Sequence, residues 1–399
     1  MIIIDEKNKS KCCGCTACAN ICPRNAIKMQ EDFEGFLYPV IDKKKCTNCG
    51  LCNKTCPILN KQNNDSGIEK AYALRSRDKE NLRKSTSGGF FTPVAKYIID
   101  NGGIVYGVGF DKEFNVCHKE AKNLKDIQGF KGSKYVQSFL GDIFEKIKGQ
   151  LKENKTVLFS GTPCQVEGLK RYLNKNYENL ITIDLICHGT PSPKLWRMYI
   201  DYQEKKYKSK VREAYFRNKT YGYHSSTMKI VFKNGRKYYG SARVDYMLKS
   251  FFSEISSRPS CYECQFKKRN HLSDITIYDC WSIEKLNSKI SDDDFGYTNI
   301  IVNSTKGIEI LNNIKEEFEI YNVDLDEQIR YDGSMVEKSA IPHERRNEYY
   351  QQLSKLGVKN NLDKFMKITF KDKIIEASKF FWYKLNLNVF LKKIRSNKI

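Results

Sequence analysis

Two short cysteine runs near the start of the chain constrain its fold more than any other feature. Residues 12–23 read CCGCTACANICP and residues 46–57 read CTNCGLCNKTCP, and both contain C-x2-C-x2-C-x3-C followed by proline. This spacing is typical of bacterial ferredoxins, in which the fourth cysteine of each run binds the cluster of the other run. The start of the chain therefore predicts a small domain with two 4Fe-4S clusters.

The crossed arrangement predicts two ligand sets: Cys12, Cys15, Cys18 and Cys56 for one cluster, and Cys46, Cys49, Cys52 and Cys22 for the other. The alternative is zinc, which takes four ligands in paired C-x2-C units and gains nothing from the two prolines. The spacing favours iron and sulfur. Cys13 lies outside the pattern, and we interpret it as a dispensable bystander.

Composition restricts the compartment and the class of partner. The chain has 15 cysteines among 399 residues, and MIIIDEKNKS at its start does not resemble an export signal, which favours thiolate ligands in a reducing cytoplasm over disulfides. No apolar run approaches the roughly 20 residues that span a bilayer. The net charge of +22 reflects either a lysine-rich composition or a basic face for an acidic electron carrier, an anionic cofactor or anionic lipid. We expect no nucleic-acid partner.

The chain divides into four predicted parts. They are a dicluster ferredoxin-type domain (1–65), an N-terminal α/β part of the body (68–190), a C-terminal part of the body (191–350) and a basic helical tail (351–399). The polar stretch NKQNNDSG marks the first boundary, and Asn234-Gly235 predicts a hairpin turn in the third part. Residues 359–399 hold eleven Lys and Arg against three Asp and Glu, so the tail either docks on the protein or lies on an anionic membrane surface.

A second group of cysteines lies in the body. Residues 155–173, KTVLFSGTPCQVEGLKRYL, predict a strand, a tight turn and a helix, and a further apolar strand ends at Cys187. Such a β-α-β unit has parallel strands, so Cys164 and Cys187 are expected at one edge of a sheet. With Cys261 and Cys264 of the C-x2-C turn they complete the four thiolates of a third 4Fe-4S cluster. The sequence leaves open whether Cys280 replaces one of these four ligands. Cys117 is interpreted as a core or surface thiol.

Two segments of the body suit an anionic group. KSTSGGFF places Ser87, Gly88 and Gly89 at the start of a helix, where free backbone N–H groups suit a phosphate, although such starts often serve capping alone. The second segment, KGSKYVQ, is rich in lysine and hydroxyl groups. No G-x-G-x-x-G fingerprint is present at a strand-to-helix turn, so nicotinamide binding is not supported.

Together these motifs resemble the coenzyme F420 hydrogenase/dehydrogenase beta-subunit family, in the version with an N-terminal dicluster ferredoxin domain. The likeness rests on STSGGFF, KGSKYVQS, FSGTPCQVEGLKRYL, DLICHGTPSP, RPSCYECQFK and SDITIYDCWSI, and on DDDFGYTNIIVNSTKG after them. The family's usual Gly-Asp-Phe/Tyr-Trp-Gly reads YDCWS here, which alters the pocket and leaves its cluster ligation open.

The resemblance implies an α+β or α/β fold, with a small ferredoxin-like domain followed by a mixed-sheet, flavin-binding body. It also implies FAD near the third cluster. The FAD-binding residues that it implies are Ser87, Gly88, Gly89, Lys131, Gly132, Ser133, Lys134, Tyr135, Val136 and Gln137.

Two functions from different classes follow. The first is an oxidoreductase that relays electrons from a ferredoxin-type donor through the clusters to FAD and a small organic substrate, such as a deazaflavin coenzyme or a surface-polysaccharide precursor. The second is an electron-transfer subunit that acts with a partner redox enzyme and has no substrate of its own. His188, beside Cys187, is the best proton-donor candidate, although a structural role is the simpler interpretation. No catalytic residue is assigned.

Overall fold

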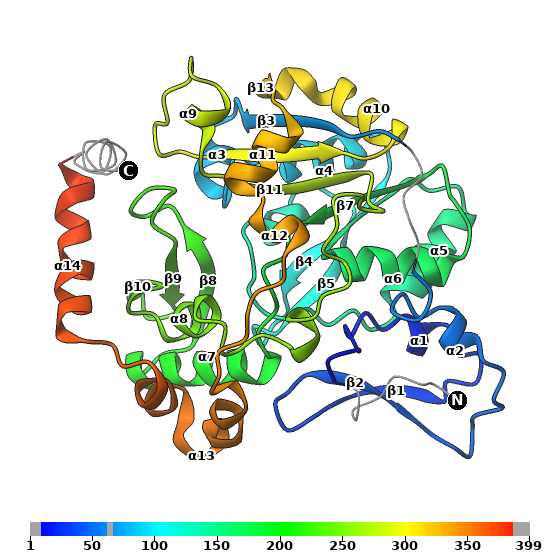
Figure 1. Cartoon of the computed structure of the whole chain (residues 1–399), viewed down its shortest axis with the longest axis horizontal. Helices are drawn as coiled ribbons and strands as arrows, with labels where there is room; N and C mark the ends of the chain where they lie inside the picture. Colours follow the sequence, from blue (N-terminus) through cyan, green and yellow to red (C-terminus); the bar gives the residue numbers. More distant parts are fainter. Residues whose placement is uncertain (1–8, 62–66, 386–399) are drawn as a thin grey trace.

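An eight-stranded mixed sheet forms the centre of the body (Figure 1). Across the sheet the strands are β13 (Phe318–Asn322), β3 (Lys70–Ser76), β12 (Tyr297–Val302), β11 (Ile275–Cys280), β7 (Leu180–Leu185), β6 (Val157–Gly161), β4 (Ile104–Phe110) and β5 (Val116–Ala121). β4, β6, β7 and β11 run parallel, and the other four pair antiparallel with their neighbours. The structure, a computed structural model, describes residues 9–61 and 67–385.

Helices cover both faces of this sheet, as the alternation of side chains along its strands requires. In β6, Leu158 packs with α4 (Phe91–Asp100) and α10 (Thr305–Ile314) on one face, whereas Val157 and Phe159 pack with α5 (Ile143–Lys152) and α6 (Pro163–Leu173) on the other. The parallel strands β6 and β7 with α6 between them confirm the predicted β-α-β unit.

A second, three-stranded sheet lies beside the first and packs in a separate hydrophobic cluster. Its strands are β8 (Val211–Asn218), β9 (Thr227–Phe232) and β10 (Lys237–Ser241). They pack with α7 (Pro193–Tyr207), α8 (Tyr246–Phe252) and α13 (Arg346–Phe365) around Trp196 and Tyr199. Gly235 turns the chain between β9 and β10 with φ +83°, which confirms the predicted hairpin.

The remaining helices lie at the margins of the two sheets. They are α3 (Lys79–Lys84), α9 (Ile283–Leu286), α11 (Leu325–Asp332) and α12 (Ser334–Glu337).

The N-terminal module is a hairpin with two short helices. Its elements are α1 (Ala17–Asn20), β1 (Ile27–Glu31), β2 (Leu37–Ile41) and α2 (Leu51–Lys54). It lies against α6 at one corner of the molecule (Figure 1), and Cys15 and Ala17 belong to the same buried cluster as the α5–α6 face. Its conformation thus follows the expected ferredoxin-like module, and the mixed α/β fold class is confirmed.

The C-terminal region forms α13 and then α14 (Phe370–Lys384) along the edge of the molecule (Figure 1). Gly357, with φ +72°, interrupts α13, whose buried residues Tyr349, Tyr350 and Leu353 join the hydrophobic cluster of the second sheet. Part of the predicted tail therefore belongs to the body, and its last residues, 386–399, lie outside the described residues. Within the described ranges, no helix combines the length and apolarity needed to cross a membrane.

Candidate functional site

The β1–β2 hairpin brings the two cysteine runs of the module together. The backbone N–H of Asp42 donates to the carbonyl of Ala26 at 2.8 Å, which closes the hairpin between the runs. One small cavity is lined by the following four cysteines: Cys22, Cys46, Cys49 and Cys52. The structure thus brings together the predicted crossed set, with Cys22 contributed by the first run.

The other crossed set gathers on the side of the module that faces α6. Burial, and then the thiols of Cys12 and Cys56, raise the pKa of Cys18 above its ordinary value. Cys15 is 7% exposed and packs so tightly on α6 that a Cβ on Gly168 would come within 3.0 Å of its sulfur. Burial and the neighbouring cysteines keep these thiols protonated in the free protein, and a bound metal would displace the protons and hold the cysteines as thiolates.

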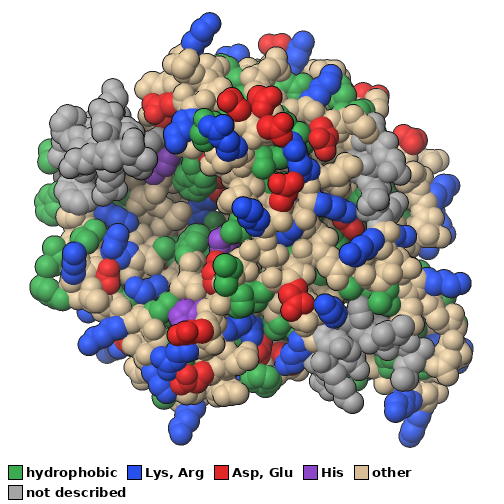
Figure 2. Space-filling model, viewed as in Figure 1, with side chains coloured by type: hydrophobic (Ala, Val, Ile, Leu, Met, Phe, Trp, Pro, Cys, Tyr) green, Lys and Arg blue, Asp and Glu red, His purple; other side chains and the backbone are tan. Residues whose placement is uncertain are grey.

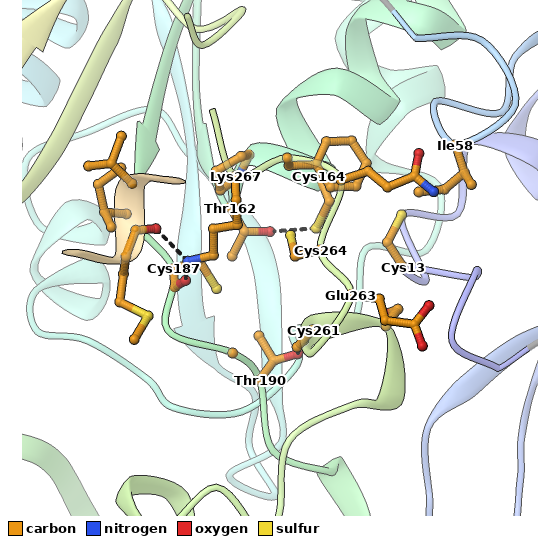
Figure 3. Close-up of a pocket in the computed structure, with 18 of the residues that line it drawn as sticks. Cys13, Ile58, Thr162, Cys164, Cys187, Thr190, Cys261, Glu263, Cys264 and Lys267 are labelled. Atoms are coloured by element: carbon orange, nitrogen blue, oxygen red, sulfur yellow. Dashed lines mark hydrogen bonds between the residues drawn. The ribbon is translucent and has the colours of Figure 1, made fainter. Parts of the chain in front are cut away.

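The four predicted body cysteines also meet. They line one cavity: Cys164 at the start of α6, Cys187 just after β7, and Cys261 and Cys264 in the loop after α8 (Figure 3). β6 and β7 are parallel neighbours, so the segments that follow them reach the same edge of the sheet. Burial, followed by the neighbouring thiols, raises the pKa of Cys187, and burial raises that of Cys264 to about 12.

Polar groups beside these thiols suit a negatively charged cluster. The Lys267 ammonium donates to the carbonyl of Cys187 and, at 2.6 Å, to that of Met335, and its side chain lines the cavity. The Thr162 hydroxyl lies 3.1 Å from the sulfur of Cys164, and the Thr190 hydroxyl lies 3.8 Å from that of Cys261. Hydroxyl groups near sulfur and a nearby cation stabilise a reduced cluster.

The spacing of cysteines in the sequence did not predict the positions of Cys13 and Cys280. Cys13 lines the body cavity with the four thiols, on the side facing the N-terminal module (Figure 3). Nothing in the cysteine spacing indicates this position. Cys280 is 1% exposed in a separate apolar cluster with Ile283 and Tyr297, and it does not line the body cavity.

A larger cavity of about 600 Å³ opens beside the thiol cavity. Most of the predicted flavin-binding residues line it: Ser87, Gly89, Lys131, Gly132, Ser133, Lys134, Tyr135 and Val136. The backbone N–H of Ser133 donates to the Thr86 hydroxyl at 2.9 Å, which joins the two predicted anion-binding segments into one wall. The volume falls within the range of cofactor pockets.

Two residues of the predicted set do not reach this cavity. Gly88 lies behind it, where its N–H donates to the Thr298 hydroxyl at 2.8 Å and a Cβ would approach the Leu74 carbonyl oxygen to 2.4 Å. Gln137 instead faces the N-terminal module, where its amide donates to the Cys13 carbonyl at 3.3 Å. Glycine at position 88 is thus explained by close backbone packing, which sequence could not distinguish from phosphate contact.

Lys134 stabilises its own loop. Its amine donates to the carbonyls of Gly129, Lys131 and Gly132 at 3.0 to 3.2 Å, and burial lowers its pKa to about 7. Within the described part of the chain, the Lys131 amine forms no such contacts, and burial lowers its pKa as well. Of the two predicted lysines, Lys131 is the one available to a ligand.

The larger cavity is also lined by residues that the sequence did not single out. Arg217 pairs with Asp279, and its guanidinium lies 4.7 Å from the ring centre of Trp281. Its Nη2 is buried without a hydrogen-bond partner among the described residues, which leaves a donor for a bound group. Asp279 and Trp281 lie within YDCWS, so the family motif is the signal that could have drawn attention to them.

His188 lines the same cavity, near the thiols. Its Nε2 contacts the Glu254 carboxylate, and its ring lies 5.2 Å from that of Phe251. Phe251 also stacks on Tyr135 at 4.5 Å. His188 is therefore fixed by a carboxylate and an aromatic neighbour.

The two cavities adjoin. They share Thr162, Ile186, Cys187, Gly189, Thr190 and Met335. A group bound by the four body thiols would therefore lie next to a molecule in the larger cavity.

Two buried arginines attach the N-terminal module to the body. Arg258, 1% exposed, donates through Nε to the Cys12 carbonyl at 2.7 Å and through Nη1 to Gln137 at 3.0 Å. Arg346 donates to both carboxylate oxygens of Glu34 at 3.0 and 2.7 Å. Together these contacts hold the module in a fixed position beside the body cavity.

The described residues contain no group of three His, Cys, Asp or Glu side chains that converge on a single metal ion. Each thiolate of a 4Fe-4S cluster binds a different iron, so its ligands surround a volume rather than a point. Each of the two fully lined cavities presents a set of four thiols of this kind.

Comparison with known protein families gives two matches. Residues 154–328 match the family described as the C terminus of the beta subunit of coenzyme F420 hydrogenase/dehydrogenase. Residues 11–59 match the 4Fe-4S dicluster domain family, an iron-sulfur electron-transfer module. Both matches confirm the resemblance found in the motifs.

Two individual proteins are similar to the chain. The coenzyme F420-dependent sulfite reductase of Methanocaldococcus jannaschii is 26% identical over 185 residues, which are 45% of this chain. The chain spans only 28% of that protein's length. One chain in a xenon-derivatized structure of the F420-reducing NiFe hydrogenase complex from Methanosarcina barkeri is also similar. The alignment covers 73% of this chain and 96% of that chain, at 18% identity and a TM-score of 0.45.

Proposed function

Since residues 154–328 belong to the coenzyme F420 hydrogenase/dehydrogenase beta-subunit family and residues 11–59 to the 4Fe-4S dicluster family, we propose that this chain is an iron-sulfur flavoprotein oxidoreductase. In this proposal, electrons enter at the N-terminal clusters, pass to a third cluster in the body and reach FAD and an organic substrate. The observation that carries the proposal is the adjoining pair of cavities, which share Cys187.

The proposed ligands are twelve cysteines in three sets. They are Cys12, Cys15, Cys18 and Cys56; Cys22, Cys46, Cys49 and Cys52; and Cys164, Cys187, Cys261 and Cys264. The support is the geometry of each set, since the second and third each line one cavity and the first gathers against α6. Cys280 is not proposed as a ligand because it is buried in a different cluster.

FAD is proposed for the larger cavity. Ser87, Gly89, Lys131 and Ser133 would contact its phosphates, because hydroxyl, backbone and ammonium donors gather on that wall. A bound flavin supplies the exchange between single electrons and the electron pairs that organic reductions need. Arg217, which lines the same cavity, would hold an anionic group of the cofactor or the substrate through its free Nη2.

His188 is the candidate to hold a proton at this site. Its Nε2 contacts Glu254, which fixes the ring at the boundary between the two cavities. The substrate class is a small organic molecule, with a deazaflavin coenzyme or a surface-polysaccharide precursor as the proposed alternatives.

A second candidate function is a relay subunit without a substrate of its own. It is favoured by two apolar residues that line the larger cavity and are exposed to solvent, Leu185 at 40% and Phe252 at 42%. An apolar rim is typical of a surface that a partner covers. The partner would be a redox subunit or an acidic electron carrier, to which the charge of +22 is complementary.

The proposal is tested by anaerobic reconstitution of the full chain with iron, sulfide and FAD. We expect about twelve iron atoms per chain, because three 4Fe-4S clusters hold four each. We also expect flavin absorbance that bleaches when the clusters are reduced. Cluster content without flavin binding would leave the relay function and refute the flavoenzyme.

A charge reversal tests the flavin wall. Lys131→Glu should weaken FAD binding by at least about tenfold, because it replaces a charge-assisted contact with repulsion of the phosphates. Lys125→Glu is the matched control, since this exposed lysine lies in the same region but does not line the cavity. Equal FAD affinity in the two variants would show that the FAD phosphates do not contact Lys131.

We also propose that this otherwise cytoplasmic protein contacts an anionic membrane through α14. Three exposed side chains of α14 fall within an arc of about 40° at 100° per residue: Phe370, Ile374 and Phe381. Leu385, just after the helix, is exposed as well. Figure 2 shows hydrophobic side chains along this edge of the molecule. The opposite side of the helix is held to the body by Glu376, which accepts from the N–H of Ser241 at 2.7 Å. An outward apolar stripe on a basic segment is typical of interfacial helices.

Vesicle sedimentation tests this contact. The protein should sediment with phosphatidylglycerol vesicles and not with phosphatidylcholine vesicles, and the double variant Phe370→Ser/Phe381→Ser should lose binding. Ile341→Ser is the control, because Ile341 is 85% exposed outside α14. Self-association without vesicle binding would instead assign the stripe to a second copy of the chain.

A further inference from the structure

Cys13 lies between two of the proposed ligand sets. In the chain it follows Cys12 and precedes Cys15 by two residues, and both belong to the first N-terminal set. In space its side chain lines the body cavity, with its sulfur directed into the cavity beside Cys164 (Figure 3). The Cys15 thiol and the Cys164 thiol both lie close enough to Cys13 to shift its pKa, one from each ligand set. Of the N-terminal cysteines, Cys13 is the one that lines this cavity among the described residues.

The backbone around Cys13 is fixed by buried groups of the body. Arg258 binds the Cys12 carbonyl, Gln137 binds the Cys13 carbonyl, and the two side chains bind each other at 3.0 Å. The Arg258 guanidinium also lies 4.1 Å from the ring centre of Tyr38 in the module. A surface thiol without a role would not need this arrangement.

Gly14 turns the chain so that its neighbours diverge. It has φ +70°, and a Cβ there would come within 2.3 Å of the Gln137 amide nitrogen. Cys15 consequently packs on α6 at Gly168, whereas Cys13 enters the body cavity. The left-handed conformation at Gly14 therefore sends the two cysteines that flank it to two different sites.

We propose that Cys13 is the contact through which electrons pass from the N-terminal cluster of Cys12, Cys15, Cys18 and Cys56 to the body cluster. This inference rests on the proposed function. Cys13 is not needed as a ligand, because each of the two sets already has four thiols. Sulfur is large and polarizable, so a thiol couples two sites better than a methyl or a hydroxyl group does.

The step is a transfer of one electron without bond changes. The N-terminal cluster is oxidised by one electron, the body cluster is reduced by one, and no proton moves. The electron is supplied by the external reductant, which is dithionite in the experiment below.

The experiment compares the full reconstituted wild type with Cys13→Ser and Cys13→Ala. After rapid mixing with dithionite, freeze-quench EPR follows the reduction of each cluster. We expect both variants to keep the iron and sulfide contents of the wild type. Both should lose the fast phase in which the body cluster is reduced. The slow phase, in which dithionite reduces the body cluster directly, should persist. The reduction potentials of all clusters should stay unchanged. Cys117→Ala is the control, because this half-buried cysteine lies on β5 outside both cavities.

Two results would overturn the inference. Loss of four irons in Cys13→Ser would make Cys13 a ligand, and a fast phase equal to that of the wild type would remove it from the electron path. A wild-type protein without clusters would instead refute the proposed function, so the two failures are distinguishable.

Discussion

Replacing Glu34 by alanine should loosen the attachment of the N-terminal module to the body. The Glu34 and Arg346 side chains are 4% and 7% exposed, and two hydrogen bonds join them. Removing one partner of a buried ion pair costs about 3 to 5 kcal/mol, mainly because the other charge stays buried. Arg346 keeps its bond to the Ser257 carbonyl at 2.8 Å and its position over Tyr350 at 4.7 Å, so the lower end of this range applies.

Urea unfolding measures the effect, followed anaerobically through tryptophan fluorescence, to which the buried Trp196 contributes beside Trp281 and Trp382. Trp196 belongs to the same buried cluster as Phe36, Tyr38 and Tyr350, so its signal follows the core that the module completes. A loss of about 3 kcal/mol lowers the unfolding midpoint by roughly 1 M for a slope of about 3 kcal/mol per M. The same variant should slow electron transfer into the body cluster, because the module is held less firmly.

The matched control is Glu31→Ala in the same module. Glu31 pairs with Arg197 at 2.7 Å, but their side chains are 40% and 41% exposed, so its loss should cost at most about 1 kcal/mol. In the double variant Glu34→Leu/Arg346→Met, most of the lost stability should return, since an apolar pair leaves no buried charge. Equal midpoints for Glu34→Ala and Glu31→Ala would refute the reasoning.

Three further predictions concern the cluster site and its surroundings. Cys280→Ser should keep the full iron content and Cys264→Ser should lose about four irons per chain; the reverse result in iron analysis would exchange their roles. Lys267→Met should lower the reduction potential of the body cluster by about 40 mV, which corresponds to a loss of about 1 kcal/mol in stabilisation of the reduced cluster. EPR-monitored titration measures it, with the N-terminal clusters as unchanged controls. Burial lowers the pKa of His118 to about 4, so its neutral form contributes stability that is complete above pH 6.5 and is lost as pH falls towards 4. Between pH 7.5 and 5 the free energy of unfolding of the wild type should therefore fall by about 2 kcal/mol more than that of His118→Gln, measured by urea unfolding. Other titrating groups, such as Asp245, are present in both proteins, so their opposing effects cancel in this comparison.

The parts of the fold and site that sequence predicted are those governed by local spacing. The doubled cysteine run indicates the two crossed sets, and the apolar strands around residues 157–187 indicate a β-α-β unit that brings Cys164 and Cys187 to one edge. Asn234-Gly235 indicates the hairpin turn. In each case the determining residues lie close together in the chain, so periodicity and spacing carry the information.

The parts that sequence missed depend on contacts between distant segments. The position of Cys13 beside Cys164 depends on how the module docks, and docking depends on Arg258 and Glu34, which carry no recognisable spacing. Gly88 resembles a phosphate-binding glycine, but its space is taken by the backbone of β3 and β12. Arg217 reaches the large cavity from the second sheet, which no local pattern joins to the first.

The position of β3 also decides where this chain can be divided. β3 follows the module directly, yet it pairs with β12 and β13 from the far end of the body. A recombinant fragment of residues 154–328 would lack β3, β4 and β5, leaving β13 without its neighbour and opening both β6 and β12 as unprotected edges. Open edges promote aggregation, so this family-matched segment is not an autonomous folding unit. A cut within residues 70–322 therefore separates strands that pair in one sheet.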